Sequence, residues 1–237
     1  MGLDLHFQKL HLSRPVEGGA ELHFSLPPGS ALVVVGRNGS GKSTLLNTLA
    51  GLLAPRSGEV RLGERSVMRM SARDRATWIS LVTSTPAKPS GLTVGDVMAL
   101  GAAAGGQVDA PTRSVEAMAD AGIAQWRDQP LSTLSDGMAQ RVMVARAGLQ
   151  SNAVMLLDEP TAFLDIVGKE EVLGAVGRWR GGERTVILTT HDVEAVAQAG
   201  WSTHWLHLHP GREGGATLHA HPLEVEAVRS AIRGDRT

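Results

Sequence analysis

The sequence predicts an α/β fold built on a parallel sheet with helices on both faces. Three unbroken apolar runs support this, at residues 31–35, 153–157 and 185–188. Such runs, rich in branched side chains, are typical of strands that are buried on both faces. A pattern with helical spacing follows each run, and the repeated order of strand, loop and helix predicts a doubly wound core.

The remaining segments predict additions to this core. Residues 21–26 alternate apolar and polar side chains before the turn at 27–29, which indicates a half-buried strand. The stretch from about 86 to 150 is rich in Ala, Gly and Met, with apolar residues at helical spacing. One helical face is predicted to carry Met138, Val142, Ala145 and Leu149. We therefore expect one domain of 237 residues, with a core at 1–85 and 151–237 and an inserted helical subdomain at 86–150.

Composition excludes several classes of protein. A formal net charge of -1 disfavours a nucleic-acid partner, since such domains usually carry a basic excess. The chain has no cysteine, which excludes disulfides, thiolate metal sites and cysteine nucleophiles. The first residues are too polar for a secretory signal, and no apolar run approaches the roughly 20 residues of a spanning helix. Any membrane role is expected to depend on a partner.

A phosphate-binding loop follows the first buried run. Residues 36–44 match G-x-x-x-x-G-K-[ST] between a predicted strand and a predicted helix. Glycines let backbone N–H groups surround phosphate oxygens, and the helix N-terminus adds its dipole. Lys42 is expected to neutralise the β and γ oxygens of a nucleoside triphosphate, and Ser43 to bind Mg²⁺. The predicted nucleotide-binding residues are Gly36, Asn38, Gly39, Ser40, Gly41, Lys42, Ser43 and Thr44.

Two carboxylates end the second buried run, where ligands gather in open α/β sheets. Asp158 is expected to hold Mg²⁺, and Glu159 to polarise the water that attacks the phosphate. In isolation such a pair is more often a solvated strand end that caps the next helix. The phosphate loop in the same chain favours the catalytic interpretation.

The sequence Leu134-Ser135-Asp136-Gly137-Met138 resembles the LSGGQ signature of the ATP-binding-cassette ATPases. A serine at a helix start is by itself usually only an N-cap. The resemblance implies that Ser135 and Gly137 contact the γ-phosphate of the opposite protomer in a dimer. It also implies an N-terminal antiparallel β-subdomain beside the phosphate-binding core.

Two further motifs occur in the order of that family. Residues 162–165 resemble the D-loop, which implies that Asp165 communicates across the dimer. His191 follows Thr189-Thr190 and resembles the switch histidine that touches the γ-phosphate. A lone histidine at a strand end is otherwise usually a surface group. Together with Lys42 and Glu159, His191 completes the predicted catalytic set.

The sequence also departs from the family at several positions. Ser84 stands where a glutamine normally links Mg²⁺ to the membrane partner, so we expect looser coupling. No tyrosine is present to stack on adenine, and His11 or Leu12 occupies that place. In the signature, Asp136 puts a negative charge near a phosphate and Met138 removes a hydrogen bond, so nucleotide affinity is expected to be modest.

Two weaker patterns concern cargo and metal. Residues 91–101 resemble a stretch of the cassettes that serve iron-chelate, haem and cobalamin importers. Five histidines near the end admit a metal site, but the alternation at 203–208 predicts a strand with its polar face in water. We assign no metal ligand among these histidines, which are His204, His207, His209, His219 and His221.

The resemblance implies an ATPase that uses ATP and Mg²⁺ and acts as a homodimer on a membrane transporter subunit. It further implies a place at the cytoplasmic face of the inner membrane, with an extracytoplasmic binding protein in the wider system. Two alternatives remain at this point. One is a soluble cassette for iron–sulfur assembly or nucleic-acid work, and the other is a nucleotide sensor with little turnover.

Overall fold

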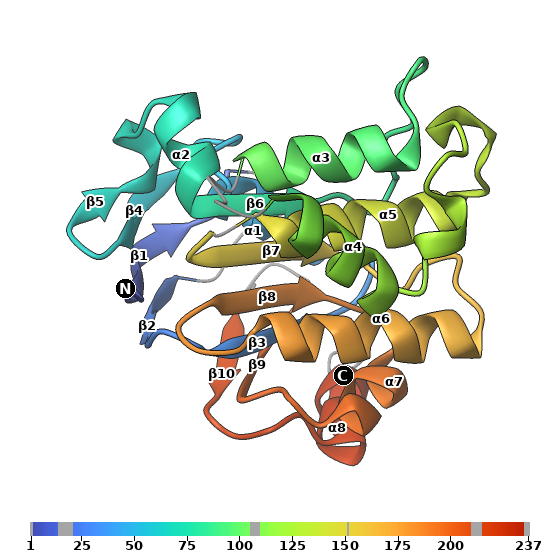
Figure 1. The fold of residues 1–237 in the computed structure, drawn as a ribbon. Coiled ribbons are helices and arrows are strands. Elements are labelled where there is room, and N and C mark those ends of the chain that lie inside the picture. The colour runs from blue at the N-terminus through green and yellow to red at the C-terminus, as the bar shows by residue number, and fades with distance from the viewer. Residues whose placement is uncertain (1, 14–20, 105–109, 151, 210–214, 235–237) are drawn as a thin grey trace.

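The computed structural model describes residues 2–13, 21–104, 110–150, 152–209 and 215–234. Two sheets and several helices make up this part of the chain (Figure 1). The predicted fold class, an α/β core with a parallel sheet and an added antiparallel sheet, is confirmed.

The larger sheet has six strands in the order β10-β9-β3-β8-β7-β6. All neighbours run parallel except the β9 and β10 pair. The three predicted buried strands are its centre, and β3, β7 and β8 are buried along their whole length. The strands are β3 (Ala31–Val35), β6 (Ile79–Val82), β7 (Val154–Asp158), β8 (Thr185–Thr189), β9 (His204–Leu208) and β10 (Ala216–His219).

The smaller sheet is antiparallel, with the order β2-β1-β4-β5. Its inner side chains, such as Phe7 and Leu26, join one hydrophobic core with the larger sheet and helix α1 (Lys42–Leu49). The helix therefore lies buried between the two sheets, directly behind the phosphate loop. The strands are β1 (Leu5–His11), β2 (Leu22–Leu26), β4 (Ser57–Leu62) and β5 (Arg65–Ser66).

Three helices cover the opposite face of the larger sheet. They are α6 (Ile166–Trp179), α7 (Val193–Ala199) and α8 (Val225–Gly234). Apolar residues of these helices form a second core with the other faces of β3, β7 and β8. With α1 on one side and these helices on the other, the central strands are covered twice, which explains their unbroken apolar runs.

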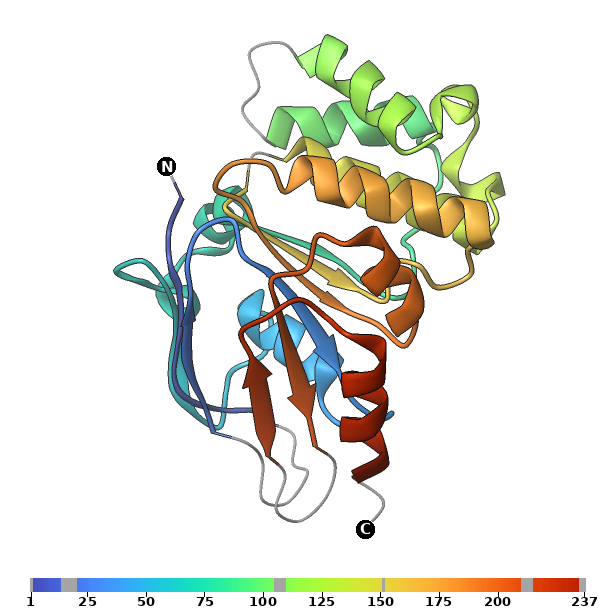
Figure 2. The same ribbon diagram turned by 90° about the horizontal axis from the view of Figure 1, so that it is seen from below.

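The segment predicted as helical forms helices α3 (Val94–Ala104), α4 (Ala110–Asp120) and α5 (Asp136–Leu149). They gather at one end of the molecule beside α6 (Figure 2). They share a third core, in which Val142, Ala145 and Leu149 are buried and Met138 is partly buried, as the predicted face requires. Helix α2 (Ala72–Trp78) and short 3-10 turns at Val67–Arg69, Ala124–Trp126 and Leu131–Thr133 complete the helical elements described.

The prediction of a solvated polar face at 203–208 is wrong. Strand β9 lies inside the sheet between β3 and β10, so His207 is fully buried and pairs in register with Val35. The ring of His219 on β10 stacks on Trp205, with ring centres 3.6 Å apart. Alternation alone could not show that a strand is internal to a sheet. Among the described residues no cluster of three or more ligating side chains suits a metal ion.

None of the helices in the described part of the chain is long and apolar enough to cross a membrane.

Candidate functional site

The predicted catalytic residues come from neighbouring strand ends. The register of the parallel strands places Asp158 beside Thr189, and Val34 is paired with the same threonine from the other side. Carboxyl ends of parallel strands share one edge of a sheet. The phosphate loop after β3, the acidic pair at the end of β7 and the histidine after β8 therefore meet at that edge.

The phosphate loop has the backbone that its glycines permit. Gly39 and Gly41 have φ of 82° and 98°, in the left-handed region that other residues rarely adopt. Gly41 caps α1 without a side-chain hydrogen bond, so the first N–H groups of that helix are open to an anion. Ser40 Oγ is buried and finds no hydrogen-bond partner among the described residues. The cradle thus offers several donors, and Asn38, Ser43 and Thr44 border it in sequence.

Lys42 points back over this loop. Its buried Nζ donates to the carbonyl oxygens of Gly36, at 2.8 Å, and Arg37, at 3.2 Å. Burial lowers the pKa of the Lys42 ammonium, and the negative charges of Glu159 and Asp158 oppose that shift. The ammonium is therefore held between the loop and the acidic pair, where it can neutralise phosphate oxygens.

Asp158 is buried and oriented by a residue that the sequence did not single out. Thr189 Oγ1 donates to Asp158 Oδ1 at 2.6 Å, and the same Oγ1 accepts from the backbone N–H of Glu159 at 3.0 Å. Thr189 thereby fixes both members of the acidic pair. Its position directly before Thr190 and His191 was the available signal, but which threonine faces the sheet edge depends on strand register.

Glu159 and His191 contact each other at the rim of the site. The backbone N–H of His191 donates to Glu159 Oε2 at 3.1 Å, and His191 Nε2 lies 3.2 Å from Glu159 Oε1. The second contact is close, but its geometry is not that of a hydrogen bond. Glu159 has φ of 50°, an uncommon conformation for a residue with a side chain. With this backbone, the Glu159 carboxylate faces His191.

A hollow of about 430 Å³ opens at this rim. Ser84, Glu159 and His191 all line it, so the structure brings the predicted coupling residue to the catalytic pair. The same hollow is bordered by residues 161–164, which precede Asp165. Asp165 itself is exposed and caps α6 by accepting the Gly168 N–H at 2.8 Å.

The start of α5 packs against Phe163 and Leu164, which border this hollow. Ser135 caps the helix, accepting the Met138 N–H at 3.2 Å, and is exposed. Neither Ser135 nor Gly137 lines the hollow that contains Glu159. A Cβ on Gly137 would approach the Phe163 carbonyl oxygen to 2.5 Å, so this position has no room for a side chain.

The negative charge of Asp136, which was expected to lie near a bound phosphate, is paired with a lysine of the same chain. Lys88 Nζ lies 2.5 Å from Asp136 Oδ1 and donates to the Leu134 carbonyl oxygen at 2.8 Å. Lys88 carries no local sequence signal of this role, because it lies 48 positions before Asp136 in the chain. Gln140 on the same helix is also buried, and its Nε2 donates to the Thr83 carbonyl oxygen at 3.1 Å. Two contacts therefore join α5 to the loop that carries Ser84.

The structure distinguishes between the two residues proposed to contact the adenine base, His11 and Leu12. His11, on β1, has its Nε2 3.3 Å from Oε2 of Glu21, the residue directly before β2. The side chain of Leu12 approaches Gly41 of the phosphate loop, with its Cδ1 3.4 Å from where a Cβ on that glycine would lie. Leu12, not His11, is thus the residue beside the nucleotide loop, and its contact with a base would be aliphatic.

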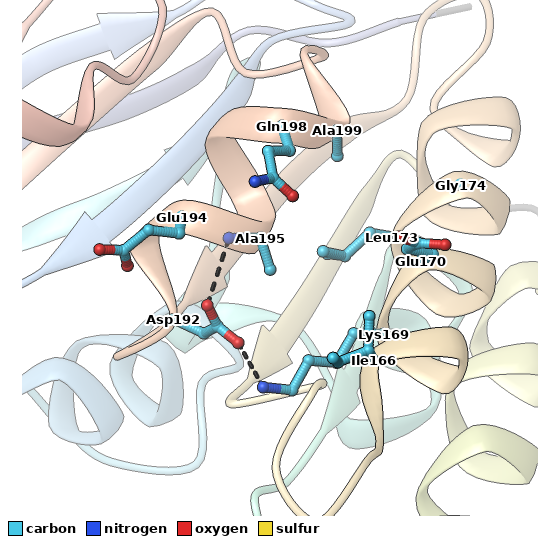
Figure 3. A pocket seen from close by; sticks show the side chains of 10 residues that line it. All are labelled: Ile166, Lys169, Glu170, Leu173, Gly174, Asp192, Glu194, Ala195, Gln198 and Ala199. Carbon is cyan, nitrogen blue, oxygen red and sulfur yellow. Dashed lines mark hydrogen bonds and ion pairs between the residues drawn. The ribbon is translucent and has the colours of Figure 1, made fainter.

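A larger hollow of about 630 Å³ lies between α6 and α7 (Figure 3). Leu173 and Ala195 face each other across it, and Lys169 pairs with Asp192 at its edge, 2.5 Å apart. None of the predicted catalytic residues lines it. Size therefore does not identify the site, and the chemistry lies at the strand ends.

The chain is similar to proteins of one family. The family model described as ABC transporter matches residues 20–162. The iron(3+)-hydroxamate import ATP-binding protein FhuC of Bacillus subtilis (strain 168) is 33% identical over 185 residues, which cover 75% of this chain and 69% of that protein. The hemin import ATP-binding protein HmuV of Rhodopseudomonas palustris (strain BisA53) is 33% identical over 195 residues, covering 76% and 72%. The structure of cbiO1 from Clostridium perfringens, described as part of the ABC transporter complex cbiONQ, superposes with a TM-score of 0.77 at 26% identity and covers 99% of this chain and 94% of that one.

Proposed function

Since the chain belongs to the ABC transporter family and is an ATPase of that family, we propose that it energises the import of a metal chelate or a metal-containing tetrapyrrole. The observation that carries the proposal is the meeting of Lys42, Glu159 and His191 at one sheet edge. These are the groups that phosphoryl transfer to water needs: a cation for the phosphates, a base and a γ-phosphate contact.

We assign the roles as follows. Lys42 neutralises the β and γ oxygens, and the loop N–H groups hold them in place. Glu159 takes the proton of the attacking water, and His191 fixes the γ-phosphate and, through its N–H, the carboxylate of Glu159. The contact between Glu159 and His191 makes the base and the phosphate contact depend on each other.

Mg²⁺ fits the oxygen donors of the site. The Ser43 hydroxyl and the Asp158 carboxylate would hold it, and hard oxygen ligands of this kind suit Mg²⁺. Thr189 orients Asp158 by its hydrogen bond at 2.6 Å. When bound, the ion neutralises charge on the β and γ phosphates.

Two copies of the chain would form the working unit. Ser135 is exposed at the start of α5, which supports a role toward a second copy, and Gly137 lies buried in the first turn of the same helix. An exposed helix N-terminus favours a phosphate. Asp165, at the exposed start of α6, is assigned to the contact between the copies.

The helical segment 86–150, inserted between core parts 1–85 and 151–237, is proposed to dock on an integral membrane subunit. Ser84 would transmit nucleotide state to it, since it lines the hollow with Glu159 and precedes the helices. We assign the chain to the cytoplasmic face of the inner membrane, where such a subunit would lie, with an extracytoplasmic binding protein delivering cargo. The stretch 91–101 and the relatives named for iron-hydroxamate and hemin import support an iron-chelate, haem or cobalamin-type cargo.

Assembly tests this function. Glu159→Gln should bind ATP but retain it, so dimers should accumulate with ATP and Mg²⁺ in analytical ultracentrifugation. The matched control is Glu159→Gln with Lys42→Ala, which should stay monomeric. Copurification with a multi-span protein should identify the membrane subunit. Monomers of Glu159→Gln at saturating ATP would contradict the proposed dimer, and copurification with nucleic acid instead would favour a soluble cassette.

A further inference from the structure

We infer that Lys88 is an electrostatic positioning residue, which neutralises Asp136 so that the N-terminus of α5 can receive a phosphate of the partner copy. The inference rests on the proposed function, because it assumes that α5 faces the other copy's nucleotide. It adds a residue outside every motif found in the sequence.

The geometry gives Lys88 two contacts at the start of one helix. It lies in the loop between β6 and α3, and its Nζ pairs with Asp136 at 2.5 Å while it donates to the Leu134 carbonyl oxygen at 2.8 Å. Ser135, between these two residues, keeps its own capping bond to Met138. Lys88 therefore contacts the residues on both sides of Ser135, and no contact with the Ser135 hydroxyl is involved.

The charges explain why the pair acts as a unit. A helix N-terminus is positive and favours an acidic residue such as Asp136 in the first turn. That same carboxylate would repel an approaching phosphate, because like charges a few ångströms apart disfavour each other strongly near a protein surface. A lysine alone would be misplaced at this helix end. When Lys88 and Asp136 are paired, their charges cancel, and the backbone N–H groups at the start of α5 can attract the phosphate.

Folding alone does not account for the pair. The side chains of Lys88 and Asp136 are 27% and 57% exposed, and ion pairs with this exposure contribute little to stability. Helix α5 has stronger anchors elsewhere, including Gln140 to the Thr83 carbonyl and Arg184 to carbonyls at its C-terminal end. The pair is therefore dispensable for holding the helix, and its effect should appear when a phosphate binds.

The test measures ATP-driven dimerisation, with every variant built on Glu159→Gln. We expect Lys88→Met to raise the ATP concentration for half-maximal dimerisation by about tenfold or more, because Asp136 is then uncompensated. Asp136→Asn alone should change it by less than about threefold. The double variant should return to within about twofold of the Glu159→Gln parent, and added salt should reduce the defect of Lys88→Met by screening.

Controls separate charge from structure. Arg229→Met breaks a comparable exposed pair with Glu194, on α8 and α7, and should leave dimerisation unchanged. Lys88→Arg keeps the charge and should behave as the parent. Thermal unfolding of each variant checks that it is folded, and if Lys88→Met is unfolded, Lys88→Gln replaces it.

A defect in Lys88→Met that Asp136→Asn does not rescue would overturn the inference, as would normal dimerisation of Lys88→Met, and either result would leave the proposed function standing. Failure of the Glu159→Gln parent to dimerise would instead remove the proposed dimer and this inference together.

Discussion

The sheet edge and the start of α5 both carry predicted nucleotide contacts, but the fold secures them differently. At the sheet edge, Lys42 and Asp158 are buried and bonded to backbone or to a buried threonine. At the start of α5, Ser135 and Asp136 are exposed, and a partly exposed lysine, Lys88, pairs with Asp136. Folding one chain therefore completes the first region, whereas the second is left exposed at the surface, as the proposed role toward a second copy requires.

The largest effect should come from removing the cation of the sheet edge. Lys42→Ala should abolish nucleotide binding in calorimetry, because the phosphates lose the one lysine of their loop and the buried carboxylates remain. Arg73→Ala, an exposed cation on α2, serves as the control and should bind ATP normally. Wild-type affinity in Lys42→Ala would show that the loop binds by its backbone alone.

Removing the base should separate binding from turnover at the same edge. Glu159→Gln should keep ATP affinity and slow hydrolysis by roughly 10²–10⁴, as expected for loss of a general base. Steady-state phosphate release measures the rate, and calorimetry measures the affinity. If turnover stays within about tenfold of wild type, Glu159 is not the base and another residue of the hollow activates the water.

The two ends of α5 should differ in their effect on stability. Arg184 donates to the carbonyl oxygens of Gly148, Gln150 and Asn152, and its partly buried guanidinium loses solvation there, which lowers its pKa. Arg184→Met should reduce the free energy of unfolding by about 2 kcal/mol or more, since it leaves these carbonyls without their donor.

Lys88→Met, at the other end of α5, is the matched comparison and should cost less than about 1 kcal/mol. Urea unfolding of both variants measures the two values. If both variants lose the same free energy of unfolding, the two ends of α5 do not differ in their contribution to stability.

The smallest effect should come from Ser84, at the border of the two regions. A serine hydroxyl is shorter than a glutamine amide and would need a water to bridge the same distance. Stimulation of ATP turnover by the membrane subunit and cargo should therefore be small, and Ser84→Gln should raise the ratio of stimulated to basal kcat a few-fold.

Reconstituted vesicles with and without cargo give the ratio for wild type and for Ser84→Gln. Strong stimulation of the wild type that the glutamine leaves unchanged would assign coupling to other contacts, such as Gln140 with Thr83.

The sequence predicted the central strands because burial on both faces leaves a local pattern, the run at Ala31–Val35 being the clearest. It predicted that Lys42, Asp158, Glu159 and His191 act together because each belongs to a motif. It could not predict Thr189 or Lys88, whose roles depend on strand register and on a contact between distant segments. The wrong prediction for the polar face of β9 has the same cause, because the residues of a strand do not show which strands lie beside it.

The contact between Gly137 and Phe163 has a mechanical consequence. The Phe163 carbonyl oxygen lies 2.5 Å from where a Cβ of residue 137 would be, so the two backbones are in close contact, and Phe163 itself has φ of 64°. Densely packed parts of a protein transmit displacement instead of absorbing it. A displacement of the start of α5 is therefore expected to shift the segment that leads to Asp165 in the same copy, because a direct backbone contact joins the two.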